Sequence, residues 1–251
     1  MMYKFWKSSF FSLILIQLFT GHMQGQKIIT WFDAGIKAQL GGSGLYNSAI
    51  LNANSLDYVL DLSNSYGLGG KVGINWDEIG ISLEAMYNSN NSSIKRISTN
   101  NAVSYINHSW NGLDFYPMLR SARNLGYLEI GPKVSMIQNM KQTVAGVTSS
   151  DVSSQYNKLN YGAVVGFGSN VIGIGEAFTG MLGIRIEYGV TDLVTAGDGK
   201  RLSAPLNLGN LYDQGYKSTH PLFIGLVFEA NFGIGYFGRA KCGARSKFMR
   251  F

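Results

Sequence analysis

The chain has 251 residues, of which 45% are hydrophobic and only 14% charged, and it contains 32 glycines and 4 prolines. Soluble domains usually have about a quarter of their residues charged, so this composition argues against a surface that faces water on all sides. The formal net charge is +6, but the basic residues are scattered and form no stripe interleaved with stacking aromatics. Nucleic acid is therefore not an expected partner, and the length fits one large β domain.

The first residues are typical of a secretory signal peptide. Lys4 and Lys7 precede an apolar segment at 10–19, and a short polar stretch follows. The apolar segment is too short to span a bilayer as a helix. We expect residues 1–25 to be the signal peptide, with cleavage before Gln26. No cysteine ends this segment, so a lipoprotein anchor is not expected, and the single cysteine of the chain, Cys242, excludes an internal disulfide.

Downstream of the signal, apolar and polar residues alternate with period two, which is typical of strands with two different faces. The last segment is the clearest: every even position from Leu222 to Tyr236 is apolar, while Glu229 and Asn231 stand among the glycines between them. Segments of about 10 residues are long enough to cross a bilayer as tilted strands. The alternation predicts eight strands, at 28–40, 66–76, 79–87, 112–120, 127–141, 159–170, 178–190 and 222–236.

The connections between these segments alternate between short and long. They are brief at 77–78, 121–124 and 171–176, and they are longer and rich in Asn, Ser and Gly at 41–65, 89–103, 145–157 and 195–221. Transmembrane barrels have short periplasmic turns and long external loops. The sequence therefore predicts an all-β fold over 26–237, an eight-stranded antiparallel transmembrane β-barrel in the outer membrane of a Gram-negative bacterium.

A secreted soluble barrel would show the same alternation. Three features favour the membrane, and the first is the alternation of short and long connections described above. The polar face carries glycine rather than the charges of a wet surface, and aromatic residues gather at strand ends. Four tyrosines lie near the long loops and four aromatics near the short turns, which predicts two girdles: Tyr66, Tyr87, Tyr161 and Tyr188, and Phe32, Trp76, Phe178 and Tyr236.

If the apolar face meets lipid, the other face places six acidic and six basic residues in the lumen. These are Asp33, Lys37, Lys71, Glu84, Asp114, Arg120, Glu129, Lys133, Lys141, Arg185, Glu187 and Glu229. An eight-stranded barrel is just wide enough for side chains to fill it, whereas open channels need about sixteen strands. We therefore expect a structural network of ion pairs, because an unpaired charge there would be costly.

The sequence carries little that suggests catalysis. His108 and Ser109 are adjacent, so they point to opposite faces of a strand and cannot act as a Ser/His pair. Asp213 and His220 give only a weak match to the rim residues of an omptin-like protease. No metal-ligand spacing, phosphate loop or nucleophile elbow is present, so we expect no enzyme activity, cofactor or metal.

The strand that opens at 127–134, with the sequence YLEIGPKV, resembles the PorT-like outer-membrane β-barrel family of Bacteroidota. The Gln start of the mature chain and the glycine-punctuated strand at 223–238 are similar to that family as well, and the resemblance covers most of 27–237. It implies a barrel fold. One member of the family belongs to the type IX secretion and gliding machinery.

Three functions are considered on this basis. The first is a non-enzymatic membrane scaffold in protein secretion or envelope organisation, with an envelope or periplasmic protein as partner besides outer-membrane lipid. The second is a surface-binding or adhesion barrel that acts through its external loops. The third is a small-solute pore.

The last segment, 238–251, is expected in the periplasm, because an even number of strands returns the chain to the side where it starts. It is rich in basic residues and contains the one thiol: Arg239, Lys241, Cys242, Arg245, Lys247 and Arg250. Such a segment is either a solvated end or a docking segment for an acidic partner, whose attraction would weaken with salt.

Overall fold

The structure is a computed structural model, and it describes residues 30–48, 58–76, 78–97, 103–123, 125–144, 150–174, 178–195, 197, 216–238 and 247–249. The expected signal peptide at 1–25 and Asp213 lie outside these ranges. Within them, no helix is long and apolar enough to cross a membrane.

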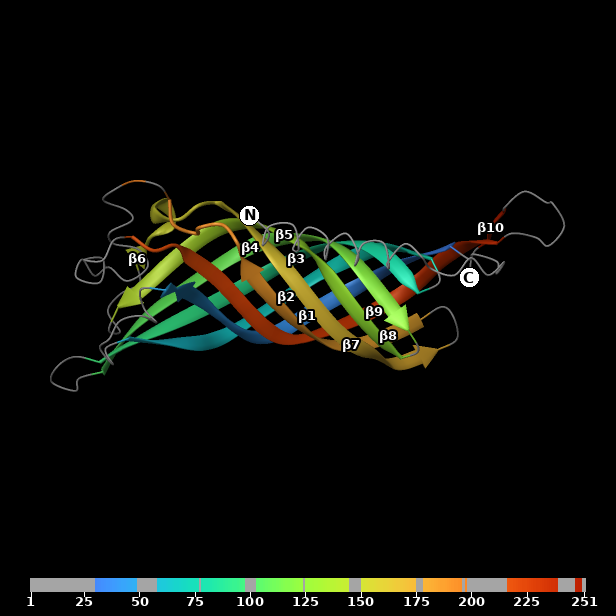
Figure 1. Cartoon of the computed structure of the whole chain (residues 1–251), viewed down its shortest axis with the longest axis horizontal. Helices are drawn as coiled ribbons and strands as arrows, with labels where there is room; N and C mark the ends of the chain where they lie inside the picture. The colour runs from blue at the N-terminus through green and yellow to red at the C-terminus, as the bar shows by residue number, and fades with distance from the viewer. Residues whose placement is uncertain are drawn as a thin grey trace, which may run out of the picture.

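Eight long antiparallel strands form a closed ring (Figure 1). They are β1 (Thr30–Asn47), β2 (Tyr58–Trp76), β3 (Ile79–Ile97), β4 (Val103–Arg123), β5 (Gly126–Val144), β7 (Leu159–Ile174), β8 (Phe178–Gly189) and β9 (Thr219–Gly238). Each strand pairs with its neighbour in sequence, and β1 pairs with β9 from Thr30 opposite Phe237 to Asn47 opposite Thr219. The ring therefore has no free edge along its length.

The two faces of the wall follow the alternation of the sequence. On β2 the outward side chains of Tyr66, Leu68 and Val72 are more than half exposed, whereas Lys71 between them is buried. From Tyr66 to Trp76 there are ten residue steps, which span about 33 Å along a strand and about 25 Å once the strand tilts by about 40°. That height matches the apolar band of a transmembrane barrel.

The strands run further on the long-loop side than the alternation predicted. β1 continues to Asn47 and β2 starts at Tyr58, so most of the connection expected at 41–65 is strand. β3 and β4 likewise reduce the loop expected at 89–103 to 98–102. These extensions are rich in Ser and Asn, which have low or modest strand propensity, so the sequence pattern predicts loops there.

Inward side chains stabilise these polar extensions. Ser65 Oγ donates to Asn90 Oδ1 at 2.5 Å, and Ser43 Oγ donates to the Asn91 carbonyl at 2.6 Å. In these extensions, hydrogen bonds between polar side chains take the place of the apolar packing on which the alternation pattern depends. The barrel therefore continues above its apolar band as a wall rich in polar side chains, on which Val59, Leu62, Val103 and Tyr105 are also exposed.

The described ring has four register shifts, and two of them lie toward the long-loop end of the barrel. Pairing between β2 and β3 is interrupted between Leu62 and Tyr66, and β4 and β5 shift register between Asn111 and Gly112. A bulge inserts one extra residue and so exchanges the two faces of the strand beyond it. The second bulge corrects one prediction: Lys141, expected in the lumen, is exposed on the outside, because it lies beyond this shift.

The short connections lie at one end of the barrel, together with the start of β1 and the end of β9 (Figure 1). This is the periplasmic end by the loop-length rule. A short strand, β10 (Lys247–Met249), pairs with Gly238, Phe237 and Tyr236 at the end of β9. Residues 247–249 thus lie beside the end of β9 at this end of the barrel.

Candidate functional site in the barrel lumen

The lower part of the lumen holds a continuous network of eight charged side chains from seven strands. Its members, here called the lower network, are Asp33, Lys37, Lys71, Glu84, Arg120, Glu129, Arg185 and Glu229. Each belongs to the inward set of its strand, and the closed ring brings them to one level. Four are acidic and four basic, so the network is neutral.

The acidic centre of the network is made by Glu84, Glu129 and Glu229, whose carboxylates come within 4.8 Å of one another. Three acidic oxygens at this spacing resemble a cation site. The Lys37 ammonium lies among them, at 2.6 Å from Glu84, 3.4 Å from Glu129 and 3.2 Å from Glu229. This lysine side chain, which is fully buried, supplies the positive charge that the three carboxylates require.

Two arginines link the carboxylates around the ring. Arg120 contacts Glu129 at 2.7 Å and Glu229 at 2.6 Å, and Arg185 contacts Glu84 at 2.8 Å and Glu129 at 2.6 Å. Charge-assisted hydrogen bonds of this length are among the stronger interactions in proteins. Since every carboxylate of the centre has at least two cationic partners, the network behaves as one unit that fills the cross-section.

Glycines on the inward face leave room for these long side chains. A Cβ atom added at Gly166 would lie within 2.8 Å of two atoms of Glu129. The glycine-rich polar face of the sequence thus has a steric cause, because a barrel of this size cannot hold a side chain at every inward position.

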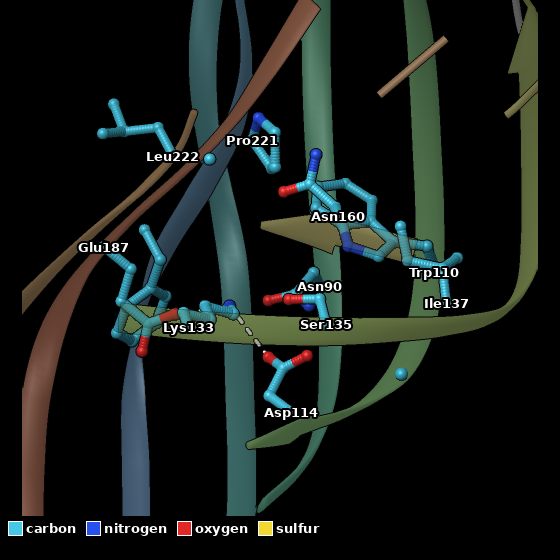
Figure 2. Close-up of a pocket in the computed structure, with 13 residues that line it drawn as sticks. Asn90, Trp110, Asp114, Lys133, Ser135, Ile137, Asn160, Glu187, Pro221 and Leu222 are labelled. Atoms are coloured by element: carbon cyan, nitrogen blue, oxygen red, sulfur yellow. Dashed lines mark hydrogen bonds and ion pairs between the residues drawn. The ribbon is translucent and has the colours of Figure 1, made fainter. Parts of the chain in front are cut away.

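A second, smaller group of charges lies above the lower network, toward the long-loop end. Lys133 contacts Asp114 at 2.8 Å and Glu187 at 2.6 Å (Figure 2). The Tyr116 hydroxyl lies 3.2 Å from both carboxylates, and Asn88 Nδ2 donates to Asp114 at 2.5 Å. The group has two carboxylates and one ammonium, so its formal net charge is −1.

Beside this group lies a small cavity, lined also by Asn90, Trp110 and Asn160 (Figure 2). Its volume is about 20 Å³, and a water molecule needs about 10–15 Å³ by this measure. The cavity has room for a single water but not for an organic solute.

The mouth at the long-loop end is covered by a lid, formed by residues 150–157 and 190–195. The first segment contains β6 (Ser150–Asp151) and the 3₁₀ helix η1 (Ser153–Gln155), where the sequence predicted a plain loop at 145–157. The two segments are joined by a bridge between Tyr156 and Val194 and by a hydrogen bond from the Asn157 amide to the Leu193 carbonyl at 2.8 Å.

The lid is attached by an apolar cluster. The wall contributes three inward side chains to this cluster: Leu45, Trp110 and Met140. The lid contributes four side chains that pack on them: Val152, Tyr156, Leu193 and Val194. All seven are buried. The lumen of the described structure is therefore closed twice, by ion pairs in the middle and by this apolar cluster at the mouth.

The sequence placed eleven of these charged residues on the inward face, and the structure brings all eleven into the two groups. With Lys141 outside, the described lumen has six acidic and five basic members. The lumen therefore has one positive charge fewer than the balanced set that the sequence predicted, and the difference lies at the Lys133 group.

Sequence reasoning missed the uncharged side chains that complete the site. The Tyr116 ring packs under the Arg185 guanidinium at 5.0 Å from its centroid, Arg120 lies 4.5 Å over Tyr127, and Asn231 Nδ2 donates to Glu229 at 2.6 Å. Each occupies an inward position of its strand. The alternation of the sequence already assigns them to the inward face, but an ion-pair network by itself calls only for charged side chains.

The catalytic candidates are kept apart by the structure. His108 is buried inside the barrel while Ser109 is exposed outside, as their adjacency predicted. The His220 ring stacks on Tyr188 at 5.4 Å. Of the basic tail, Lys247 belongs to β10, and Arg239, Lys241, Cys242, Arg245 and Arg250 lie outside the described residues.

An apolar outer band around a lumen filled with ion pairs defines this protein as an eight-stranded transmembrane β-barrel of the bacterial outer membrane. The chain belongs to the family of the outer membrane protein beta-barrel domain, whose sequence profile matches residues 33–195. Among solved structures, it is similar to Neisserial surface protein A (NspA), with 8% identity and a TM-score of 0.35 over 79% of this chain and 96% of that one. The comparison with curated proteins gives no significant match.

Proposed function

We propose that this protein is a non-enzymatic scaffold of the outer membrane, working in protein secretion or in envelope organisation. The observation that carries the proposal is the doubly closed lumen. A barrel whose interior is filled by ion pairs and covered by an apolar lid offers its two ends and its outer wall for function, rather than a path for solutes.

The resemblance of 127–134 to PorT-like barrels supports a role beside a type IX-like secretion machinery. A partner in the periplasm would meet the short turns and the basic tail. Pairing of β10 with β9 anchors this tail at the barrel rim, which supports a docking role for Arg239, Lys241, Arg245, Lys247 and Arg250. The attraction would favour an acidic partner and would weaken with salt.

Affinity purification of the full chain from native outer membrane, after chemical crosslinking, tests this proposal. We expect a defined set of envelope proteins to copurify. Changing the five basic tail residues to glutamine should release a periplasmic partner, whereas the control Lys141→Gln/Lys158→Gln, at two exposed lysines of the opposite end, should retain it. A purification that yields the barrel alone would contradict the scaffold.

A second candidate is a surface-binding barrel. It is favoured by the polar wall that β2, β3 and β4 raise above the apolar band, because ordered strands present a more rigid surface than loops. Shortening the connection between β1 and β2, at 48–57, should then abolish binding to the surface partner while the barrel still assembles, because the paired strand residues on either side are kept. A small-solute pore is the third candidate, and the closed lumen disfavours it.

A further inference from the structure

In the polar wall, a groove lies between the two bulges described above, and its exposed residues, Asn64, Asn107 and Ser109, open it to the outside. It has a volume of about 370 Å³, within the size range of small-ligand pockets, and it is lined by eight residues: Ser63, Asn64, Asn91, Ser92, Asn107, His108, Ser109 and Thr143. We call it the amide groove. The interruption between Leu62 and Tyr66 opens it, since there β2 no longer pairs with β3.

The chemistry of the amide groove is neutral and rich in hydrogen-bonding groups. Asn107 and Ser109 are exposed on the outer face of β4, and within the described residues their side chains make no hydrogen bond to the barrel wall. Asn91 Nδ2 donates to the Asn64 carbonyl at 2.7 Å, which fixes the floor of the groove. Amides and hydroxyls both donate and accept, so they match a ligand that has many hydroxyl groups.

Aromatic rings border the groove on the same outer face. Tyr66 lies two residues from Asn64 on β2, and Tyr105 lies two residues from Asn107 on β4. Their exposed fractions are 58% and 44%. An exposed tyrosine offers an apolar ring face beside a polar hydroxyl, a pairing that suits the faces and hydroxyls of a sugar ring.

The position of the groove relative to the apolar band indicates the source of such a sugar. Tyr66 and Tyr87 mark the upper limit of the apolar band, and the groove opens sideways directly above them. A molecule anchored in the outer leaflet would place its headgroup at this level. We propose that the amide groove binds the saccharide headgroup of a glycolipid in the outer leaflet, of the lipopolysaccharide class. This proposal is independent of the scaffold function.

The test uses the full mature barrel in nanodiscs that contain phospholipid with either rough lipopolysaccharide or lipid A without core sugars. After transfer to mild detergent, native mass spectrometry counts the glycolipid that each barrel retains. We expect wild type to retain the sugar-bearing lipid in preference to lipid A. Asn107→Ala/Ser109→Ala should weaken that retention at least about tenfold, because two hydrogen bonds of ordinary strength are lost.

The control Ser121→Ala/Ser169→Ala changes two outward hydroxyls at the opposite end of the barrel and should behave as wild type. Migration on unheated gels shows that each variant has folded. Equal retention of both lipids by wild type, or full retention by the Asn107/Ser109 variant, would overturn the proposal. Free core oligosaccharide that binds as tightly as the glycolipid would overturn the assignment to a membrane-anchored source.

Discussion

At the scale of single residues, the structure places two lysines of β5 in different environments, although the alternation of the sequence assigns both of them to the lumen. Lys133 lies inside between two carboxylates, and Lys141 lies outside. Lys133→Ala should lower the free energy of unfolding by about 3–5 kcal/mol, because it leaves buried charge without a partner. Lys141→Ala should change it by less than about 0.5 kcal/mol, as surface substitutions do. Urea unfolding in lipid vesicles measures both values, and equal effects would mean that the β5 bulge is misplaced.

The inward glycines give a second prediction at this scale. Gly166→Val should destabilise the barrel by about 1–3 kcal/mol, since the new side chain displaces Glu129 from its cationic partners. Gly70→Val is the matched control: Gly70 faces outward, and its nearest neighbour, the Gly35 carbonyl, is at an ordinary 3.5 Å. The same unfolding measurement compares them. A Gly166→Val barrel as stable as Gly70→Val would show that the lumen has spare room.

At the scale of elements, the outer surface of the strands depends on depth. Leu226→Arg places a cation in hydrocarbon and should cost about 2–4 kcal/mol near the midplane. Val103→Arg makes a comparable change at an exposed position of β4 above the apolar band, and it should be tolerated. The assembly of each variant into vesicles, measured by its migration on unheated gels, distinguishes the two substitutions. If both variants assemble equally well, the position of the band is wrong.

The lid is the second element with its own prediction. Leu193→Ala removes a fully buried side chain from the apolar cluster, and such a truncation costs about 2–5 kcal/mol. Hydrogen exchange of residues 150–157 should accelerate at least about tenfold while the strands keep their protection. The control Val190→Ala, at a side chain that is 59% exposed, should leave exchange unchanged. Uniform acceleration over the strands would show that the lid and barrel open together.

The sequence predicted the strands, their faces and eleven lumen charges because each depends on period-two alternation, which is local. It could not predict the reversal at Lys141, since a bulge depends on the pairing between β4 and β5. It also missed the lid, because Val152 and Tyr156 come from one connection and Leu193 from another, and they meet only when the ring closes. The polar extension of β2 and β3 was missed for a related reason: its hydrogen bonds are made between strands.

At the scale of the whole molecule, the closed ring, the neutral lower network and the lid together describe a barrel whose lumen is closed at two levels within the described residues. Planar-bilayer recording tests this claim most directly, with a sixteen-stranded porin inserted in the same membrane as positive control. We expect the purified barrel to give no stable current steps, because the ion pairs fill the cross-section and the cavity beside the Lys133 group has room for a single water. Steady, porin-like conductance from the folded barrel would contradict the account.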